Sequence, residues 1–343
     1  MQGSDVAAHS AGVLDIRTNI LADTDALYLT AIDKYGHELW RWTFPVEKLN
    51  QQSEPISFLS IRPTYTETEN DLIVKANKRT FIFSKKDGQL KGVSVDNRKI
   101  SFANGPRFIG ARRADRSLDQ FYNHDDEKAK EKDRTYSEFP DAAVFTKLDV
   151  KQDGGDLIVT ANYKLGNLDK AQWTINPSGD LALDYTYNFS GVVDLMGIRF
   201  DYPEDQVISK RWLGAGPYRV WQNRIHGTQY DIWENDYNDP IPGETFTYPE
   251  FKGYFGNVSW MNIQTKEGTI SLTNETPDTY IGVYQPRDGR DRLLYTLPES
   301  GISVLNVIPP VRNKVNSTDL CGPSSQPKWV NGPQTGRVIF RFM

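Results

Sequence analysis

The sequence lacks several features that would assign a protein to a class at once. Its single cysteine, Cys321, excludes an internal disulfide framework and a cysteine-based metal site. No apolar run reaches about 18 residues, so no membrane span is expected, and no basic segment followed by an apolar segment marks a signal peptide after Met1. The net charge of −5 comes from interspersed acidic and basic residues, which does not favour nucleic acid or an anionic membrane as a partner.

Motifs for metal binding and nucleophilic catalysis are also missing. The four histidines show none of the spacings that hold a metal ion, and no GxSxG motif marks a hydrolase serine. The run Gly214-Ala215-Gly216-Pro217 is not a phosphate loop, because no Lys-Ser/Thr pair follows it and a proline interrupts the turn. The sequence therefore predicts no metal site and no cofactor. The histidines are His9, His37, His124 and His226.

The acidic residues offer no clear catalytic pair. Glycoside hydrolysis needs two carboxylates at a fixed separation. Glu234 and Asp236 are two residues apart, so on a strand their side chains would lie on one face, about 7 Å apart. Hydrogen-bond acceptance within a loop is the favoured interpretation of these two residues. We therefore assign no catalytic residue.

Two regions of different pattern divide the chain. Residues 27–44 alternate apolar and polar residues around the turn at residues 33–36, which predicts a β-hairpin. Two strands alone are marginally stable in water, so the hairpin is expected to belong to a small sandwich. Residues 47–63 contain glutamines, serines and two prolines and are predicted to be a linker. We expect a first domain over residues 1–50 and a second over residues 56–343.

The second region has a regular strand pattern. Alternating or β-branched runs recur about every 8–12 residues and are separated by turn residues, as in Lys86-Asp87-Gly88, which predicts an all-β sandwich or barrel. The charged run from Ser117 to Asp133 is the exception and is expected to be a surface helix or an excursion between strands. The expected strands cover residues 71–76, 79–84, 90–95, 156–165, 171–176, 181–190, 253–264, 269–273, 280–284, 301–307 and 337–342.

Residues 211–239, which we call the aromatic segment, combine rings with charged and amide side chains. They include three of the eight tryptophans, three tyrosines, two arginines after Arg211 and the amide Asn223. Such a mixture is typical of a groove in which flat rings stack on a ligand and polar groups orient it, and sugars suit such a surface. A long aromatic loop that covers one edge of a sandwich explains the composition equally well.

Two runs resemble a known family. Residues 77–108 (NKRTFIFSKKDGQLKGVSVDNRKISFANGPRF) resemble the opening of the carboxy-terminal domain of β-galactosidases of glycoside hydrolase family 2. Residues 211–233 resemble a later hallmark of that domain, in which WLGLGP precedes a short run ending in Asp-Arg and then an aromatic segment. The matching residues are Trp212, Leu213, Gly214, Gly216, Pro217 and Arg224.

The resemblance covers about residues 56–343 and implies a fold and a role. It implies a large two-sheet β supersandwich, galactose-mutarotase-like, preceded by a hairpin that forms the tail of an immunoglobulin-like sandwich. It also implies a non-catalytic module that packs against a (β/α)8 barrel carrying the catalytic glutamates. The implied partners are an oligosaccharide or polysaccharide glycan and the barrel of the same parent chain, with a periplasmic or extracellular location for that parent.

The chain departs from the family at two positions of the aromatic segment. Arg219 stands where the family has a glutamate, and Asn223 stands where it has an aspartate. Val304 also stands where the family presents a tryptophan that stacks on galactose, so the glycan is left open. Three roles remain to compare: an accessory domain, a stand-alone carbohydrate-binding module and a mutarotase-like epimerase, for which His226 with Glu234 is the candidate pair. The predicted carbohydrate-contact residues are Trp221, Arg224, His226, Trp233, Arg219, Asn223 and Glu234.

Overall fold

The computed structural model describes residues 6–7, 9–13, 24, 26–46, 62–113, 136–238, 251–286, 296–311 and 322–343. The chain divides into two compact units, Met1–Ser57 and Phe58–Met343. Within the described ranges, no helix has the length and apolar character needed to cross a membrane.

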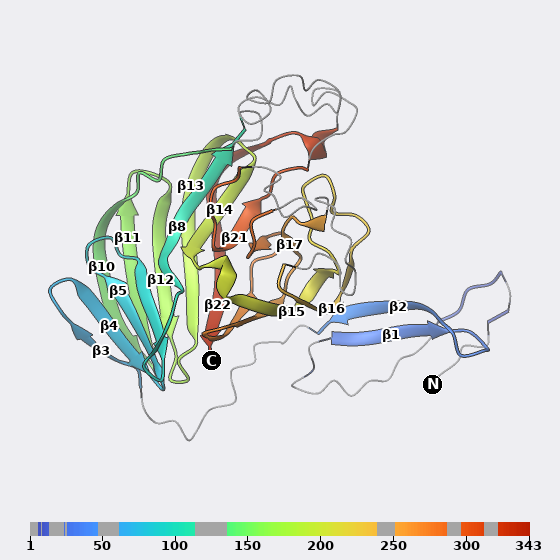
Figure 1. The fold of residues 1–343 in the computed structure, drawn as a ribbon, viewed down its shortest axis with the longest axis horizontal. Coiled ribbons are helices and arrows are strands. Elements are labelled where there is room, and N and C mark those ends of the chain that lie inside the picture. Colours follow the sequence, from blue (N-terminus) through green and yellow to red (C-terminus); the bar gives the residue numbers. More distant parts are fainter. Residues whose placement is uncertain are drawn as a thin grey trace. The chain divides into compact units, whose positions relative to one another are not determined.

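The first unit contains the predicted hairpin, formed by antiparallel strands β1 (Ala26–Ile32) and β2 (Glu38–Pro45) (Figure 1). The carboxylate of Asp33 accepts hydrogen bonds from the backbone N–H groups of Tyr35 and His37, both at 2.8 Å, and so closes the turn. Side chains alternate between the two faces of a strand, so Trp40, Trp42 and Phe44 share one face. That this hairpin belongs to an immunoglobulin-like sandwich stays a prediction.

The second unit consists of two antiparallel sheets (Figure 1). The nine-stranded sheet has the order β10 (Val144–Asp153), β11 (Asp156–Lys164), β12 (Leu168–Ile175), β13 (Leu181–Val193), β22 (Lys328–Phe342), β19 (Gly268–Asn274), β18 (Trp260–Thr265), β15 (Val207–Gly216), β16 (Gln229–Asp236). The eleven-stranded sheet has the order β17 (Phe255–Gly256), β20 (Tyr280–Gly282), β21 (Ile302–Val307), β14 (Leu195–Asp201), β8 (Ala103–Arg112), β6 (Leu90–Val95), β5 (Arg79–Ser84), β4 (Asp71–Ala76), β3 (Thr64–Glu67), with β7 (Arg98–Ile100) paired to β6 and β9 (Ser137–Glu138) paired to β8.

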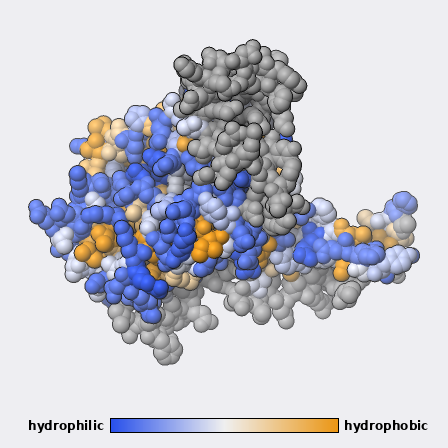
Figure 2. Space-filling view, viewed as in Figure 1, coloured by the Kyte–Doolittle hydropathy of each residue, from blue (hydrophilic) through white to orange (hydrophobic). Residues whose placement is uncertain are grey.

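The main core lies between the two sheets because each strand turns every second side chain inward. On β11, Leu157, Val159 and Ala161 are fully buried while the residues between them are more exposed. Aromatic rings from both sheets meet in this core: the ring of Phe102 stacks on that of Phe200 with centroids 4.6 Å apart and lies 5.0 Å from that of Phe340. The outer side chains are mainly polar, as Figure 2 shows for one face.

A second, smaller core covers the outer face of the eleven-stranded sheet. Ile109, Leu195 and Leu305 point away from the main core and pack beneath irregular segments that contribute Trp221 and Tyr254. This second core matters for the candidate site, because it is where the middle of the aromatic segment lies.

The prediction of an all-β, two-sheet fold is confirmed, and the sandwich is chosen over the barrel because neither sheet closes on itself in the described strands. The proposed division at residues 50–56 stays a prediction. The charged run from Ser117 to Asp133 lies outside the described residues, as does most of the predicted linker at 47–63.

Candidate functional site

The two tryptophans at the start of the aromatic segment are fully buried. Trp212, on β15, packs against Phe255 with ring centroids 5.0 Å apart and donates its indole N–H to the carbonyl of Ala215 at 3.0 Å. Trp221 meets Tyr254 edge-on with centroids 5.9 Å apart. Both rings therefore fill cores, and carbohydrate contact by Trp221 stays a prediction.

Arg219 is also buried, with 2% of its surface exposed. Its guanidinium donates to the side-chain oxygen of Asn238 at 2.6 Å and lies 4.9 Å from the ring centroid of Tyr284. Lys210 approaches the same ring at 5.0 Å, so two cations contact one tyrosine. The residue that departs from the family thus anchors a polar network inside the fold.

Asn223 fastens the aromatic segment to the chain that follows β21. Its amide N–H donates to the carbonyl of Val311, and its side-chain oxygen accepts from the N–H of Val311, both at 2.8 Å. This two-point bond satisfies a backbone group in a region where Val311 is 2% exposed. The geometry gives Asn223 a structural role.

The remaining predicted residues are more accessible. Arg224 and His226 lie exposed on the turn before β16, and Glu234 lies exposed on β16 at 3.7 Å from the guanidinium of Arg211. Trp233 is half-buried and donates to the carbonyl of Gln229 at 3.2 Å. Between His226 and Glu234, both of which are described, the structure records no hydrogen bond or ion pair. Carbohydrate contact by these residues stays a prediction.

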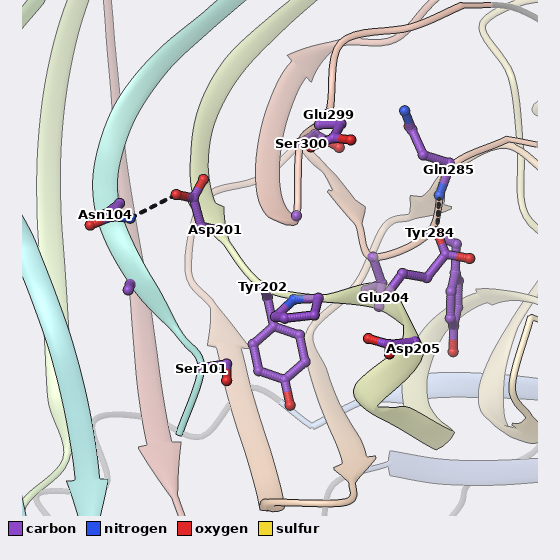
Figure 3. A pocket seen from close by; sticks show the side chains of 14 residues that line it. Ser101, Asn104, Asp201, Tyr202, Glu204, Asp205, Tyr284, Gln285, Glu299 and Ser300 are labelled. Atoms are coloured by element: carbon purple, nitrogen blue, oxygen red, sulfur yellow. Dashed lines mark hydrogen bonds between the residues drawn. The ribbon is translucent and has the colours of Figure 1, made fainter. Parts of the chain in front are cut away.

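A hollow of about 560 Å³ lies at one end of the eleven-stranded sheet and was not predicted from the sequence (Figure 3). We call it the acidic hollow, because four carboxylate side chains and no basic side chain are among the described residues that line it. The lining residues are Ser101, Ala103, Asn104, Asp201, Tyr202, Pro203, Glu204, Asp205, Val283, Tyr284, Gln285, Glu299, Ser300 and Gly301.

Hydrogen bonds fix two of the four carboxylates. Asp201, at the end of β14, accepts from the amide of Asn104 at 2.8 Å (Figure 3). It is also bound by Arg107. Glu204 accepts from the backbone N–H of Gln285 at 2.8 Å and from the hydroxyl of Tyr237 at 2.8 Å. These bonds join the connection after β14 to the chain after β20 and to the end of the aromatic segment.

Two tyrosines form part of the same wall. Burial raises the pKa of Tyr202 to about 12, and its hydroxyl donates to Glu267 at 3.3 Å. Burial also raises the pKa of Tyr284, while the charge of Arg219 acts in the opposite direction. Both phenols are therefore neutral at physiological pH, and that of Tyr202 serves as a hydrogen-bond donor.

The chemistry of the acidic hollow suits a ligand with many hydroxyl groups. Carboxylate and amide oxygens accept hydrogen bonds from hydroxyls, and the amides of Asn104 and Gln285 can donate in return. Across the described parts of the chain, no group of three or more His, Cys, Asp or Glu side chains has an arrangement that could hold a metal ion.

Only a weak sequence signal marks this hollow. The acidic run Asp201-Tyr202-Pro203-Glu204-Asp205 lies where β14 ends, a strand that the sequence analysis did not predict, and a turn there can place its side chains together. Glu299 and Ser300 are about a hundred residues away in sequence, and only the pairing of β14 with β21 brings them beside this run.

Comparison with known proteins gives one family. Residues 75–308 match the family described as β-galactosidase small chain, which is more than half of the chain. The sequence matches none of the curated proteins with which it was compared.

Three solved structures illustrate the likeness in fold. A galactose 1-epimerase from Lactobacillus acidophilus NCFM is 11% identical, with 83% of this chain and 99% of that chain covered and a TM-score of 0.45. The protein HI1317 is 9% identical, with 82% and 100% covered and a TM-score of 0.35. An amine oxidase from Aspergillus nidulans is 9% identical, with 88% and 55% covered and a TM-score of 0.32.

All three TM-scores lie below 0.5, so these likenesses carry no argument about this chain. The family match has more weight, because it spans both runs that carried the resemblance in the sequence. The chain belongs to the β-galactosidase small chain family.

Proposed function

We propose that this chain is the non-catalytic, carboxy-terminal module of a β-galactosidase-like glycoside hydrolase of family 2. In this proposal a (β/α)8 barrel in the parent protein performs hydrolysis, and the module contributes saccharide contacts at the rim of the substrate pocket. The observation that carries the proposal is the match to the β-galactosidase small chain family over residues 75–308. A periplasmic or extracellular location of the parent is part of the same proposal.

The acidic hollow supports the saccharide-binding half of the proposal. Sugar sites combine a concave surface with a few well-placed polar groups, and this hollow presents carboxylate, amide and hydroxyl groups from four separate segments. Glu299 is exposed, and its carboxylate is available to accept hydrogen bonds from a ligand. A neutral glycan is favoured there, since the four carboxylates would repel an anionic one.

The test of the catalytic half is a comparison of turnover. The isolated chain is expected to hydrolyse no nitrophenyl β-galactoside, whereas the parent protein with its barrel hydrolyses it. Turnover by the isolated chain, retained after removal of any contaminating enzyme by a second purification step, would overturn the accessory role.

A stand-alone carbohydrate-binding module is the second candidate, and the acidic hollow is the observation that favours it. Titration calorimetry of the isolated chain with neutral oligosaccharides separates the two. Binding by the isolated chain supports an independent module, whereas binding only in the presence of the barrel supports a shared rim.

A further inference from the structure

A second hollow, of about 790 Å³, lies on the nine-stranded sheet where β19 ends. Strand β22 pairs with β13 from Lys328 to Phe340, but it pairs with β19 only from Val338 to Phe342. Among the described strands, the part of β22 before Val338 therefore has a neighbour on one side only. We call the space beside this edge the β22 hollow. Its lining residues are Lys170, Asp184, Tyr185, Thr186, Glu275, Thr276, Pro277, Asp278, Asn306, Lys328, Gln334, Thr335, Gly336 and Arg337.

The register of β22 shows which backbone groups face the β22 hollow. Thr269 and Met343 exchange both backbone hydrogen bonds at 2.9 Å, so odd-numbered residues of β22 direct their N–H and C=O groups toward the β19 side. Arg337 follows this rule: its N–H donates to the hydroxyl of Thr276 at 2.7 Å. The next odd residue, Thr335, therefore turns its N–H and C=O toward the hollow. Pro333, two residues earlier in the chain, has no N–H that could remain unpaired, as expected for a proline at the edge of a sheet.

The acidic side chains of the β22 hollow are mostly neutralised within the protein. Arg337 forms ion pairs with Asp184 and with Glu275, the latter at 2.9 Å, so one guanidinium pairs with two carboxylates. The exposed Lys170 and Lys328 form no ion pair with any described residue. Asp278 is the one carboxylate of the lining with no ion pair in the described part of the chain. The charges that remain for a ligand are thus two positive and one negative.

We propose that the β22 hollow binds an anionic saccharide, a sugar unit that carries a carboxylate or a sulfate among its hydroxyls. By register Lys170 lies at the level of Thr335, with Thr186 between them, whereas Lys328 lies seven residues away along β22, so the two lysines attract the anionic groups of different sugar units of an oligosaccharide. The hydroxyls of Thr186 and Thr335, the amide of Gln334 and the free backbone groups of Thr335 provide donors and acceptors for the sugar hydroxyls. This inference does not rest on the proposed function, because the β22 hollow and the acidic hollow share no lining residue.

The charge contrast between the two hollows makes the proposal specific. The acidic hollow presents four carboxylates and no basic side chain among its described lining residues, so it disfavours an anion. The β22 hollow presents three basic side chains, of which two are available. A neutral and an anionic sugar should therefore bind at different places on one chain and respond to different substitutions.

The test is calorimetric titration of the folded chain with tri-galacturonate at low salt, beside a neutral galactose trisaccharide and a sulfated galactose trisaccharide. Tri-galacturonate is expected to bind the wild type and to bind a Lys170→Ala, Lys328→Ala double variant about tenfold more weakly, the size expected when two exposed ion pairs are lost. Added salt should weaken the wild-type binding, because it screens exposed charges. Binding of the sulfated sugar alone would assign the site to sulfate and not to carboxylate.

Lys266→Ala is the matched control, because Lys266 is an exposed lysine of the same sheet that does not line the hollow. It is expected to bind as the wild type does, and all variants should keep the wild-type melting temperature. No binding of either anionic sugar, equal tri-galacturonate affinity in the wild type and the double variant, or an equal weakening of neutral-sugar binding by the double variant would each overturn the proposal. A loss of neutral-sugar binding through Glu299→Gln would concern the acidic hollow alone, so the two proposals can fail separately.

Discussion

The aromatic segment and the acidic hollow differ in how sequence and exposure are related. In the aromatic segment, rings and charges are consecutive in sequence, yet Trp212, Trp221 and Arg219 are buried. The acidic hollow collects its polar groups from four separate segments, and Glu299 and Asp201 remain accessible. The comparison shows that a run rich in aromatic, charged and amide residues can mark a segment buried in the core as readily as a binding site. Substitutions in the two regions should therefore affect different properties.

The largest expected effect is on stability and comes from Trp221→Ala. Removing a fully buried indole should lower the free energy of unfolding by about 3–5 kcal/mol, since the smaller core cannot collapse around the cavity. Trp329→Ala is the control, because Trp329 is 71% exposed and its removal should change stability by less than about 0.5 kcal/mol. Urea denaturation measures both. A Trp221→Ala variant of normal stability that has lost saccharide binding would show that this ring contacts the ligand after all.

Arg219→Glu restores the family's residue type and should cost about 3 kcal/mol of stability. The new carboxylate would lose the bond to Asn238, whose amide also donates to Glu204 at 3.2 Å, and would place a second acid near Glu204 inside the fold. Arg219→Met keeps a long apolar side chain at this position and introduces no buried negative charge, so it should cost less. Chemical denaturation measures the free energy of unfolding of both variants. An equal loss in both would mean that packing, and not charge, accounts for the contribution of Arg219 to stability.

Asn223→Ala should cost about 1–3 kcal/mol, because it removes both bonds to the backbone of Val311 and leaves buried groups unsatisfied. Asn331→Ala is the control, since Asn331 is exposed on β22 and bonds only to Ser190 among the contacts recorded for its side chain. Thermal melting compares them. If Asn223→Ala had the melting temperature of the wild type but bound neutral sugar more weakly, the amide would have a role in ligand binding and not in stability.

Glu299→Gln in the acidic hollow should change stability by less than about 0.5 kcal/mol, since the side chain is exposed. It should weaken neutral-saccharide binding several-fold, because hydrogen bonds to a charged acceptor are about twice as strong as neutral ones. Glu69→Gln, an exposed glutamate in the turn between β3 and β4, is the control. Calorimetry with unchanged affinity for Glu299→Gln would remove the acidic hollow from the proposed function.

The smallest effect concerns pH and the wall of the acidic hollow. Burial raises the pKa of Tyr202 to about 12 from a model-compound value of 10.0, so its contribution to stability is fully present below pH 10. That contribution is lost as the pH rises toward 12, because the unfolded chain releases the proton first. Tyr202→Phe should therefore flatten the fall in unfolding free energy over this range. Tyr65→Phe, at an exposed position, should leave the slope as in the wild type.

Much of the fold was accessible from the sequence because sheets repeat every two residues. The predicted strands at 71–76 and 79–84 coincide with β4 and β5, and the Asp33 turn of the hairpin was found from its residue types. Strand order was not accessible. The pairing of β13 with β22, which joins residues more than a hundred positions apart, depends on which apolar faces fit together.

The candidate site was harder to predict from the sequence, because it too depends on contacts between residues that are distant in the chain. A two-point bond such as that of Asn223 to Val311 has no local pattern, so the residue was assigned to ligand contact from the composition of the aromatic segment and from its departure from the family. The acidic hollow needs Glu299 beside Asp201. The β22 hollow needs β19 to stop at Asn274, opposite Val338, while β22 extends further, to Lys328. Both are consequences of register.

The sequence by itself determined the all-β class, the hairpin, the lack of a second cysteine for an internal disulfide and the resemblance to β-galactosidases, because these depend on periodicity, composition and contiguous runs. Tertiary structure alone decided which polar groups are already engaged in contacts within the protein. Burial and pairing turned Trp221, Arg219 and Asn223 inward, and strand register assembled two hollows of opposite charge preference from residues that are distant in sequence. The physical reason is that a side chain is available to a ligand only after the protein's own contacts have been satisfied.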